Sequence, residues 1–209
     1  MIGFYDYTVV ATYLSLLFGL YGIFSAAAGD LLAASVCLLL SGLLDAFDGR
    51  IARTKKNRSD AQKRFGIQID SLNDVVCFGV LPAAIGAALG EGQTWLLATM
   101  SFFALAALIR LAYFNVMEEE RQSKTDEKRH EYLGVPVTTS ALVAPLALIL
   151  TQTLGRTAPA AVYAAFLGVL GVLYIAPVRI KKPGLVGILL MAALGVVELV
   201  LLVYGVMLL

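Results

Sequence analysis

Several residue types on which many enzymes depend are scarce in this sequence. Charged residues make up 15% of the chain, compared with roughly 25% in an ordinary soluble domain. The single histidine, His130, lies in a charged linker, which excludes a histidine-based metal site or a Ser-His triad within one chain. The two cysteines, Cys37 and Cys77, lie inside apolar runs and are expected to be small buried side chains. No internal repeat and no Gly/Ser-rich linker divides the sequence, so residues 1–209 are expected to form one domain.

The sequence is instead rich in long apolar runs. Hydrophobic residues make up 59% of the chain, and a helix needs about 20 apolar residues to cross the core of a bilayer. Stretches such as LATMSFFALAALI have no polar face at helical period, which argues against the buried helices of a soluble protein. The sequence therefore predicts an all-α, polytopic membrane helix bundle. Its seven apolar runs cover residues 7–28, 31–53, 66–89, 92–116, 136–153, 158–177 and 184–207.

Basic residues fall almost entirely on alternate connections of this bundle. Of the 16 Lys and Arg residues, all except Arg156 lie in or beside the linkers at 50–64 and 117–135, near the end of the fourth run, or after the sixth run. By the positive-inside tendency, that side of the membrane is cytoplasmic. We therefore expect a cytoplasmic N-terminus and an outer C-terminus, with the first apolar run retained as a helix and not cleaved as a signal peptide.

Two pairs of aspartates interrupt the apolar runs near this side. Asp45 and Asp48 lie at the end of the second run, and Asp70 and Asp74 lie at the start of the third. A carboxylate at the bilayer centre costs roughly 2.5–3.5 kcal/mol, so such residues usually face a cavity, a partner or an ion. The spacings i, i+3 and i, i+4 place each pair on one face of its helix. On antiparallel neighbouring helices, the two faces would bring all four carboxylates together.

Carboxylates in one pocket repel one another unless a cation neutralises them. All-oxygen ligation suits Mg²⁺ or Mn²⁺, and a two-metal carboxylate site is most commonly used to hold a phosphate-bearing substrate. Gly49 and Ala52 continue the acidic stripe of the second run, which is the helix face that carries Asp45 and Asp48. Their small size would let a ligand lie directly against the helix. Arg53, one turn beyond Gly49, is placed to meet phosphate oxygens.

These residues resemble a family signature. The pattern Asp45-x-x-Asp48-Gly49-x-x-Ala52-Arg53, followed after twelve residues by Gly66-x-x-x-Asp70-x-x-x-Asp74, matches the eight positions that mark the CDP-alcohol phosphatidyltransferase family. The resemblance implies a six-helix membrane core, usually dimeric, in which the hydroxyl of a small alcohol displaces CMP from a CDP-linked lipid. The seven apolar runs depart from that core: either the seventh is an addition, or the fifth and sixth are miscounted.

The resemblance also implies a role for each matched residue. Asp45, Asp48 and Asp70 would be metal ligands, and Asp74 would share the second metal and act as the general base on the incoming hydroxyl. The CDP-linked lipid would be bound by a set of mostly small residues together with one aspartate and one arginine: Gly49, Ala52, Arg53, Asp48 and Gly66.

The acceptor alcohol is a finer question. The contexts FGIQIDSLNDVVCFGVLPA, RLAYFN and YLGVPVTTSA resemble the phosphatidylserine synthase branch of the family, so L-serine is the expected acceptor, with glycerol phosphate or inositol phosphate as the alternatives. Arg110, in the second of these stretches, would bind the serine carboxylate or a lipid phosphate. The other interpretation of Arg110 is a snorkelling residue at a helix end.

Intramembrane aspartates also occur in cation transporters, although here they gather at one membrane face and have an arginine among them; a scaffold with idle acids is a third possibility. We expect an enzyme of the plasma membrane of a prokaryote, with its active site facing the cytoplasm. Its partners would be the membrane, the CDP-linked lipid with a diacyl or archaeol tail, L-serine and a second copy of the chain, and no nucleic acid.

Overall fold

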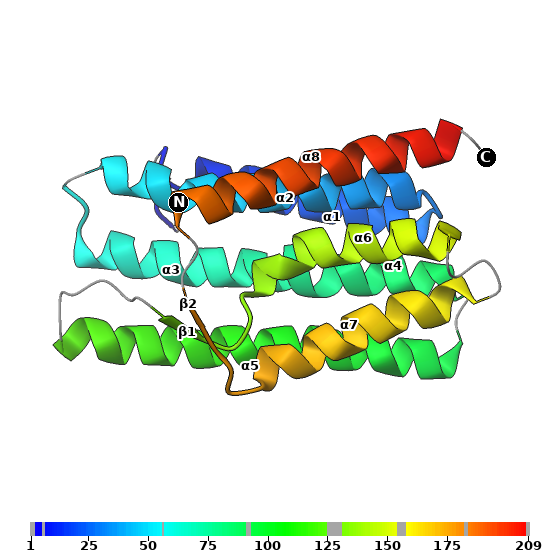
Figure 1. Ribbon diagram of the computed structural model, residues 1–209. Coiled ribbons are helices and arrows are strands. Elements are labelled where there is room, and N and C mark those ends of the chain that lie inside the picture. The colour runs from blue at the N-terminus through cyan, green and yellow to red at the C-terminus, as the bar shows by residue number, and fades with distance from the viewer. Residues whose placement is uncertain are drawn as a thin grey trace.

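The computed structural model is a bundle of helices that run side by side (Figure 1). It describes residues 3–5, 7–55, 57–90, 93–124, 131–153, 158–181 and 184–207. In chain order the helices are α1 (Val10–Ala27), α2 (Leu31–Thr54), α3 (Asp60–Asp74), α4 (Leu81–Leu89), α5 (Thr94–Lys124), α6 (Ser140–Thr153), α7 (Pro159–Ile175) and α8 (Leu185–Met207). A π-helical segment, Val75–Val80, joins α3 to α4, so that Asp60–Leu89 is one continuous helix.

The predicted all-α membrane bundle is confirmed. Each of the seven apolar runs corresponds to a helix in the described part of the chain, with α3, the π segment and α4 together forming the third. Five of these helices are long and apolar enough to cross a bilayer, and the segments 137–151 and 159–175 are shorter apolar helices. The fifth and sixth runs are therefore separate helices, and with α8 the described residues hold one apolar helix more than the six that the resemblance implied.

Two helix boundaries differ from the sequence expectation for the same physical reason. The third helix begins at Asp60 and not near residue 66, because Ser59 and Gln62 form a capping box in which each side chain bonds the other's backbone N–H, at 3.2 and 2.9 Å. Similarly, α5 continues to Lys124, so the first part of the expected 117–135 linker is helical. Both extensions are polar, and a search for apolar runs does not detect polar helical turns that leave the bilayer.

A short antiparallel ribbon is the element that the sequence did not predict. The strands β1 (Glu131–Leu133) and β2 (Arg179–Lys181) pair with Tyr132 opposite Ile180, and they join the segment after α5 to the segment after α7. Gly134 follows β1 with φ +80, and a Cβ there would lie 2.9 Å from the Tyr174 carbonyl oxygen. The strands are three residues long, which is too short for a period-two pattern to be recognised.

Close helix packing sets the positions of the site residues. Helix α1 packs along α2 and also contacts α3, the π segment and α4, while α5 packs against α7 on the other side of the bundle (Figure 1). At Gly22 of α1, a Cβ would lie 2.9 Å from Leu81 and 3.0 Å from Cys37. Because small residues let helices approach closely in lipid, α1 lies tightly between the two helices that carry the aspartates.

Candidate functional site

Three carboxylates from two helices meet inside the bundle. Asp45 of α2 and Asp70 and Asp74 of α3 each offer an oxygen, and these three oxygens lie within 4.8 Å of one another. Asp70 and Asp74 are one turn apart on the same face of α3, and Asp74 is the last residue of that helix. The predicted convergence of the two acidic stripes therefore occurs for these three residues.

The cluster has unsatisfied acceptors. Asp70 Oδ1 and Asp74 Oδ1 are buried and have no hydrogen-bond partner among the described residues, and the whole Asp74 residue is only 7% exposed. Buried carboxylate oxygens usually find a donor or an ion, because an unpaired buried charge is costly. Three converging carboxylates with two orphaned oxygens fit a hard divalent cation, for which oxygen is the preferred ligand. This group of residues can bind a metal ion.

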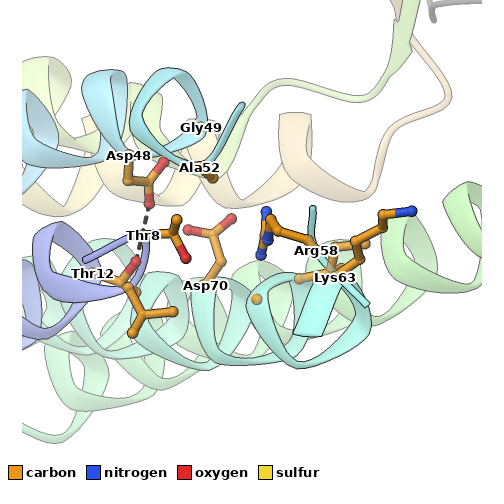
Figure 2. A pocket seen from close by; sticks show the side chains of 11 residues that line it. Thr8, Thr12, Asp48, Gly49, Ala52, Arg58, Lys63 and Asp70 are labelled. Carbon is orange, nitrogen blue, oxygen red and sulfur yellow. Dashed lines mark hydrogen bonds between the residues drawn. The ribbon is translucent and has the colours of Figure 1, made fainter. Parts of the chain in front are cut away.

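Asp48 lies beside this group but not in it. Its Oδ2 accepts a hydrogen bond from Thr12 Oγ1 at 3.4 Å, and its carboxyl group is also within hydrogen-bonding reach of Asp70 (Figure 2). Two carboxyl groups this close require a shared proton or a cation between them. Its predicted role as a ligand of the metal site therefore stays a prediction, and Asp70 is the residue that links it to the cluster.

A cleft of about 150 Å³ opens next to the acids. It lies between α2 and α3, which do not pack closely against each other at this end. Predicted nucleotide-binding residues line its walls, together with residues at and just before the start of α1 and two cations that the sequence analysis counted only for the orientation (Figure 2). The lining residues are Thr8, Val9, Thr12, Asp48, Gly49, Ala52, Arg58, Lys63, Gly66, Ile67 and Asp70. Arg53 belongs to α2, but its side chain lies outside the described part of the structure.

A buried polar network on α1 fixes the helices around the acids. Asn73 Nδ2 donates to Ser15 Oγ at 3.2 Å, and the Cys77 thiol donates to Asn73 Oδ1 at 3.3 Å. Ser41 Oγ of α2 donates to the Ser15 carbonyl oxygen at 3.1 Å. Ser15 thus ties the helix of Asp45 to the helix of Asp74. The π segment that starts directly after Asp74 is of a kind that occurs frequently at functional sites.

Arg110 of α5 is a buried cation near Asp74. It is 8% exposed, its guanidinium carbon lies 5.2 Å from the centre of the Phe114 ring, and its charge interacts with that of Asp74. Because α5 continues to Lys124, Arg110 is inside the helix and not at its end, which disfavours the snorkelling interpretation. Ser71 Oγ donates to Asn115 Oδ1 at 3.0 Å, and this bond joins α3 to α5 near the same position.

Comparisons with known proteins agree with this geometry. The family model described as CDP-alcohol phosphatidyltransferase matches residues 8–176, so α8 lies beyond the match. A CDP-diacylglycerol–serine O-phosphatidyltransferase of Saccharomyces cerevisiae is 42% identical over 112 residues, which are 53% of this chain and 39% of the yeast protein. One of Helicobacter pylori with the same name is 30% identical over 172 residues, or 79% of this chain and 67% of that protein. An archaetidylserine synthase of Methanothermobacter thermautotrophicus is 39% identical over 90 residues, or 43% of this chain and 38% of that protein. The chain thus spans less than half the length of the yeast and archaeal relatives.

Proposed function

The chain belongs to the CDP-alcohol phosphatidyltransferase family, and from this membership we propose that it transfers the phosphatidyl group of a CDP-linked lipid to the hydroxyl of L-serine. The observation that carries the proposal is the group of three carboxylates beside a cleft lined by Gly49, Ala52 and Gly66. Serine is supported by the names of the relatives, both those that use CDP-diacylglycerol and the archaetidylserine synthase. The donor is therefore CDP-diacylglycerol or CDP-archaeol.

In this reaction each group of residues has a separate task. Asp45, Asp48, Asp70 and Asp74 would hold Mg²⁺ or Mn²⁺, which would neutralise the diphosphate and stabilise charge on the attacking and leaving oxygens. Asp74 takes the proton from the serine hydroxyl, and the serine oxygen forms a bond to the phosphorus that carries the lipid. The bond from that phosphorus to the oxygen of CMP breaks, and CMP leaves. The small residues of the cleft let the nucleotide lie against α2 and α3.

The setting of the reaction follows from the charge pattern. The cleft lies at the end of α2 and α3 where the loop residue Arg58 and the α3 residue Lys63 lie, so we propose that it faces the cytoplasm of a prokaryotic cell. The lipid tails can then stay in the bilayer while the nucleotide reaches water. We also propose a homodimer, supported by the small residues of α4, and crosslinking in native-like lipid would detect it.

Serine-dependent release of CMP tests the function. The purified chain in lipid should release CMP from CDP-diacylglycerol or CDP-archaeol when serine is added, and mass spectrometry should find the serine lipid. Excess chelator should abolish the release and Mg²⁺ or Mn²⁺ should restore it, because the clustered carboxylates need a cation to coexist and to bind diphosphate.

Parallel reactions separate the alternatives. Glycerol phosphate or inositol phosphate in place of serine reveals a different acceptor. Full turnover in excess chelator would contradict the metal site. No CMP release with any acceptor, together with cation flux into vesicles, would favour a transporter.

Arg110→Gln should raise the KM for serine by about 10- to 100-fold and leave the KM for the CDP-linked lipid nearly unchanged. A hydrogen bond to a charged group contributes about 1.5–3 kcal/mol. Arg110 is a buried cation whose charge interacts with that of Asp74, the proposed base, so it can hold the serine carboxylate near that base. Steady-state kinetics with each substrate varied in turn provide the measurement. A rise in the KM for the CDP-linked lipid with the KM for serine unchanged would assign Arg110 to a lipid phosphate instead.

A further inference from the structure

Arg58 contributes a guanidinium to the cleft although it is not one of the eight signature positions. It lies in the loop between α2 and α3, and its side chain is directed into the space beside Asp70 (Figure 2). Its Nη2 donates to the Gln62 carbonyl oxygen at 3.2 Å, which holds the side chain against the first turns of α3. Its Nε is buried and has no acceptor among the described residues. A donor of this kind is available to a ligand in the cleft.

Gly66 makes room for this guanidinium. A Cβ at Gly66 would lie 2.7 Å from Arg58 Nη2, and the Arg58 guanidinium supplies all the side-chain atoms near that position. Real Cβ atoms essentially never approach another heavy atom so closely, so a side chain at residue 66 would displace the guanidinium. The absence of a side chain at Gly66 therefore leaves the space that the Arg58 guanidinium occupies in the wall of the cleft.

We infer that Arg58 binds the diphosphate of the CDP-linked lipid, an assignment that rests on the proposed function. A guanidinium presents planar, paired donors that match phosphate oxygens, and Arg58 lies across the same cleft from Gly49 and Ala52. The cleft encloses about 150 Å³, below the roughly 300–1,000 Å³ of pockets that surround a drug-sized ligand. It therefore accommodates the diphosphate with part of the nucleotide.

The competing role for Arg58 is that of a counter-ion for the acids. In the described ranges, however, Arg58 forms no ion pair with Asp48 or Asp70, although all three residues line the cleft. A counter-ion would compete with a metal ion for the same carboxylates, whereas a phosphate ligand would not. The two roles thus differ in what happens to metal binding when the guanidinium is removed.

The experiment compares ligands with and without phosphate. With the full chain in lipid nanodiscs, Arg58→Ala should weaken binding of CDP by about 10- to 100-fold, the range of a hydrogen bond to a charged group. Binding of cytidine and of Mn²⁺, the latter followed by electron paramagnetic resonance, should stay within about twofold. Arg64→Ala is the matched control, because it removes the same charge from an exposed position on α3 outside the cleft. It should leave CDP binding nearly unchanged.

A double variant tests the role of Gly66. Gly66→Ala alone should weaken CDP binding, and in the Arg58→Ala background its effect should be clearly smaller, because the displaced group is already gone and only the contact of residue 66 with the nucleotide remains. An effect of Gly66→Ala that is equally large in both backgrounds would overturn the assignment of Gly66 to Arg58.

The failures of the two proposals are distinguishable. Equal loss of CDP and cytidine binding, a change in Mn²⁺ affinity, or unchanged CDP binding in an Arg58→Ala protein whose wild type releases CMP would overturn the phosphate role of Arg58 alone. A wild-type chain that binds CDP through Arg58 but releases no CMP with serine would overturn the proposed reaction alone.

Discussion

Asn in place of Asp70 is expected to weaken binding of Mn²⁺ and of CDP together, each by at least about 100-fold. Asp70 is the central acid: its carboxylate belongs to the group with Asp45 and Asp74, and it is also the neighbour of Asp48. Substitution of a residue that only supports a metal ligand typically costs 10- to 100-fold in affinity, so loss of a ligand itself should cost no less. Electron paramagnetic resonance of bound Mn²⁺ and equilibrium dialysis of CDP measure the two affinities in the same sample.

The control for this variant is a second aspartate of the same helix. Asp60 is exposed and lies outside both the acid cluster and the cleft lining, so Asp60→Asn removes the same charge from α3 without removing a carboxylate of the site, and it frees only the exposed Lys63, with which Asp60 pairs at 3.2 Å. It should change neither affinity by more than about twofold, and Asp45→Asn should repeat the result of Asp70→Asn. If Asp70→Asn kept Mn²⁺ affinity and lost only CDP, the carboxylate would be a direct contact to the nucleotide.

The part of the site that could be predicted depends only on the spacing of residues along a helix. Asp70 and Asp74 are four residues apart, and any helix places such residues on one face, whatever surrounds it. The apolar runs predicted the number of helices for a similar reason, because a bilayer imposes a minimum length on each crossing. Local geometry and the solvent thus determine these features, and both are readable in a single sequence.

The remaining features depend on which helices meet. Thr12 and Ser15 hold Asp48 and Asn73 only because α1 packs against both α2 and α3, and scattered hydroxyl side chains on an apolar helix give no sign of this. In the sequence, Arg58 is one of several charges in a basic linker. Its contact with Gly66 forms only because the loop folds back on α3. The sequence predicted that two neighbouring helices bring their carboxylates together, and this holds for Asp45, Asp70 and Asp74. The cleft between α2 and α3 could not be predicted, because it depends on how loosely these two helices pack at this end.

The last prediction concerns proton transfer. Asp74→Asn should lower kcat by a factor of about 10² to 10⁴, the range typical of general-base loss, while the KM for the CDP-linked lipid changes by no more than about threefold. Asp74 is the innermost acid of α3. It is buried, and one of its oxygens has no partner among the described residues. Its charge also interacts with that of Arg110. A serine whose carboxylate is held by Arg110 would thus bring its hydroxyl next to Asp74.

The measurement must separate a base from a metal ligand, because Asp74 is also a member of the three-carboxylate group. Single-turnover rates give the chemical step, and Mn²⁺ affinity in the same variant gives the ligand role. An asparagine keeps one oxygen that can still bind a cation but cannot accept the proton, so a base predicts a slow step with metal and CDP still bound. Loss of Mn²⁺ and CDP affinity as severe as in Asp70→Asn would make Asp74 mainly a metal ligand. A nearly normal single-turnover rate would place the base on another residue, and Asp48 is then the next carboxylate to test, because it lines the cleft beside Asp70.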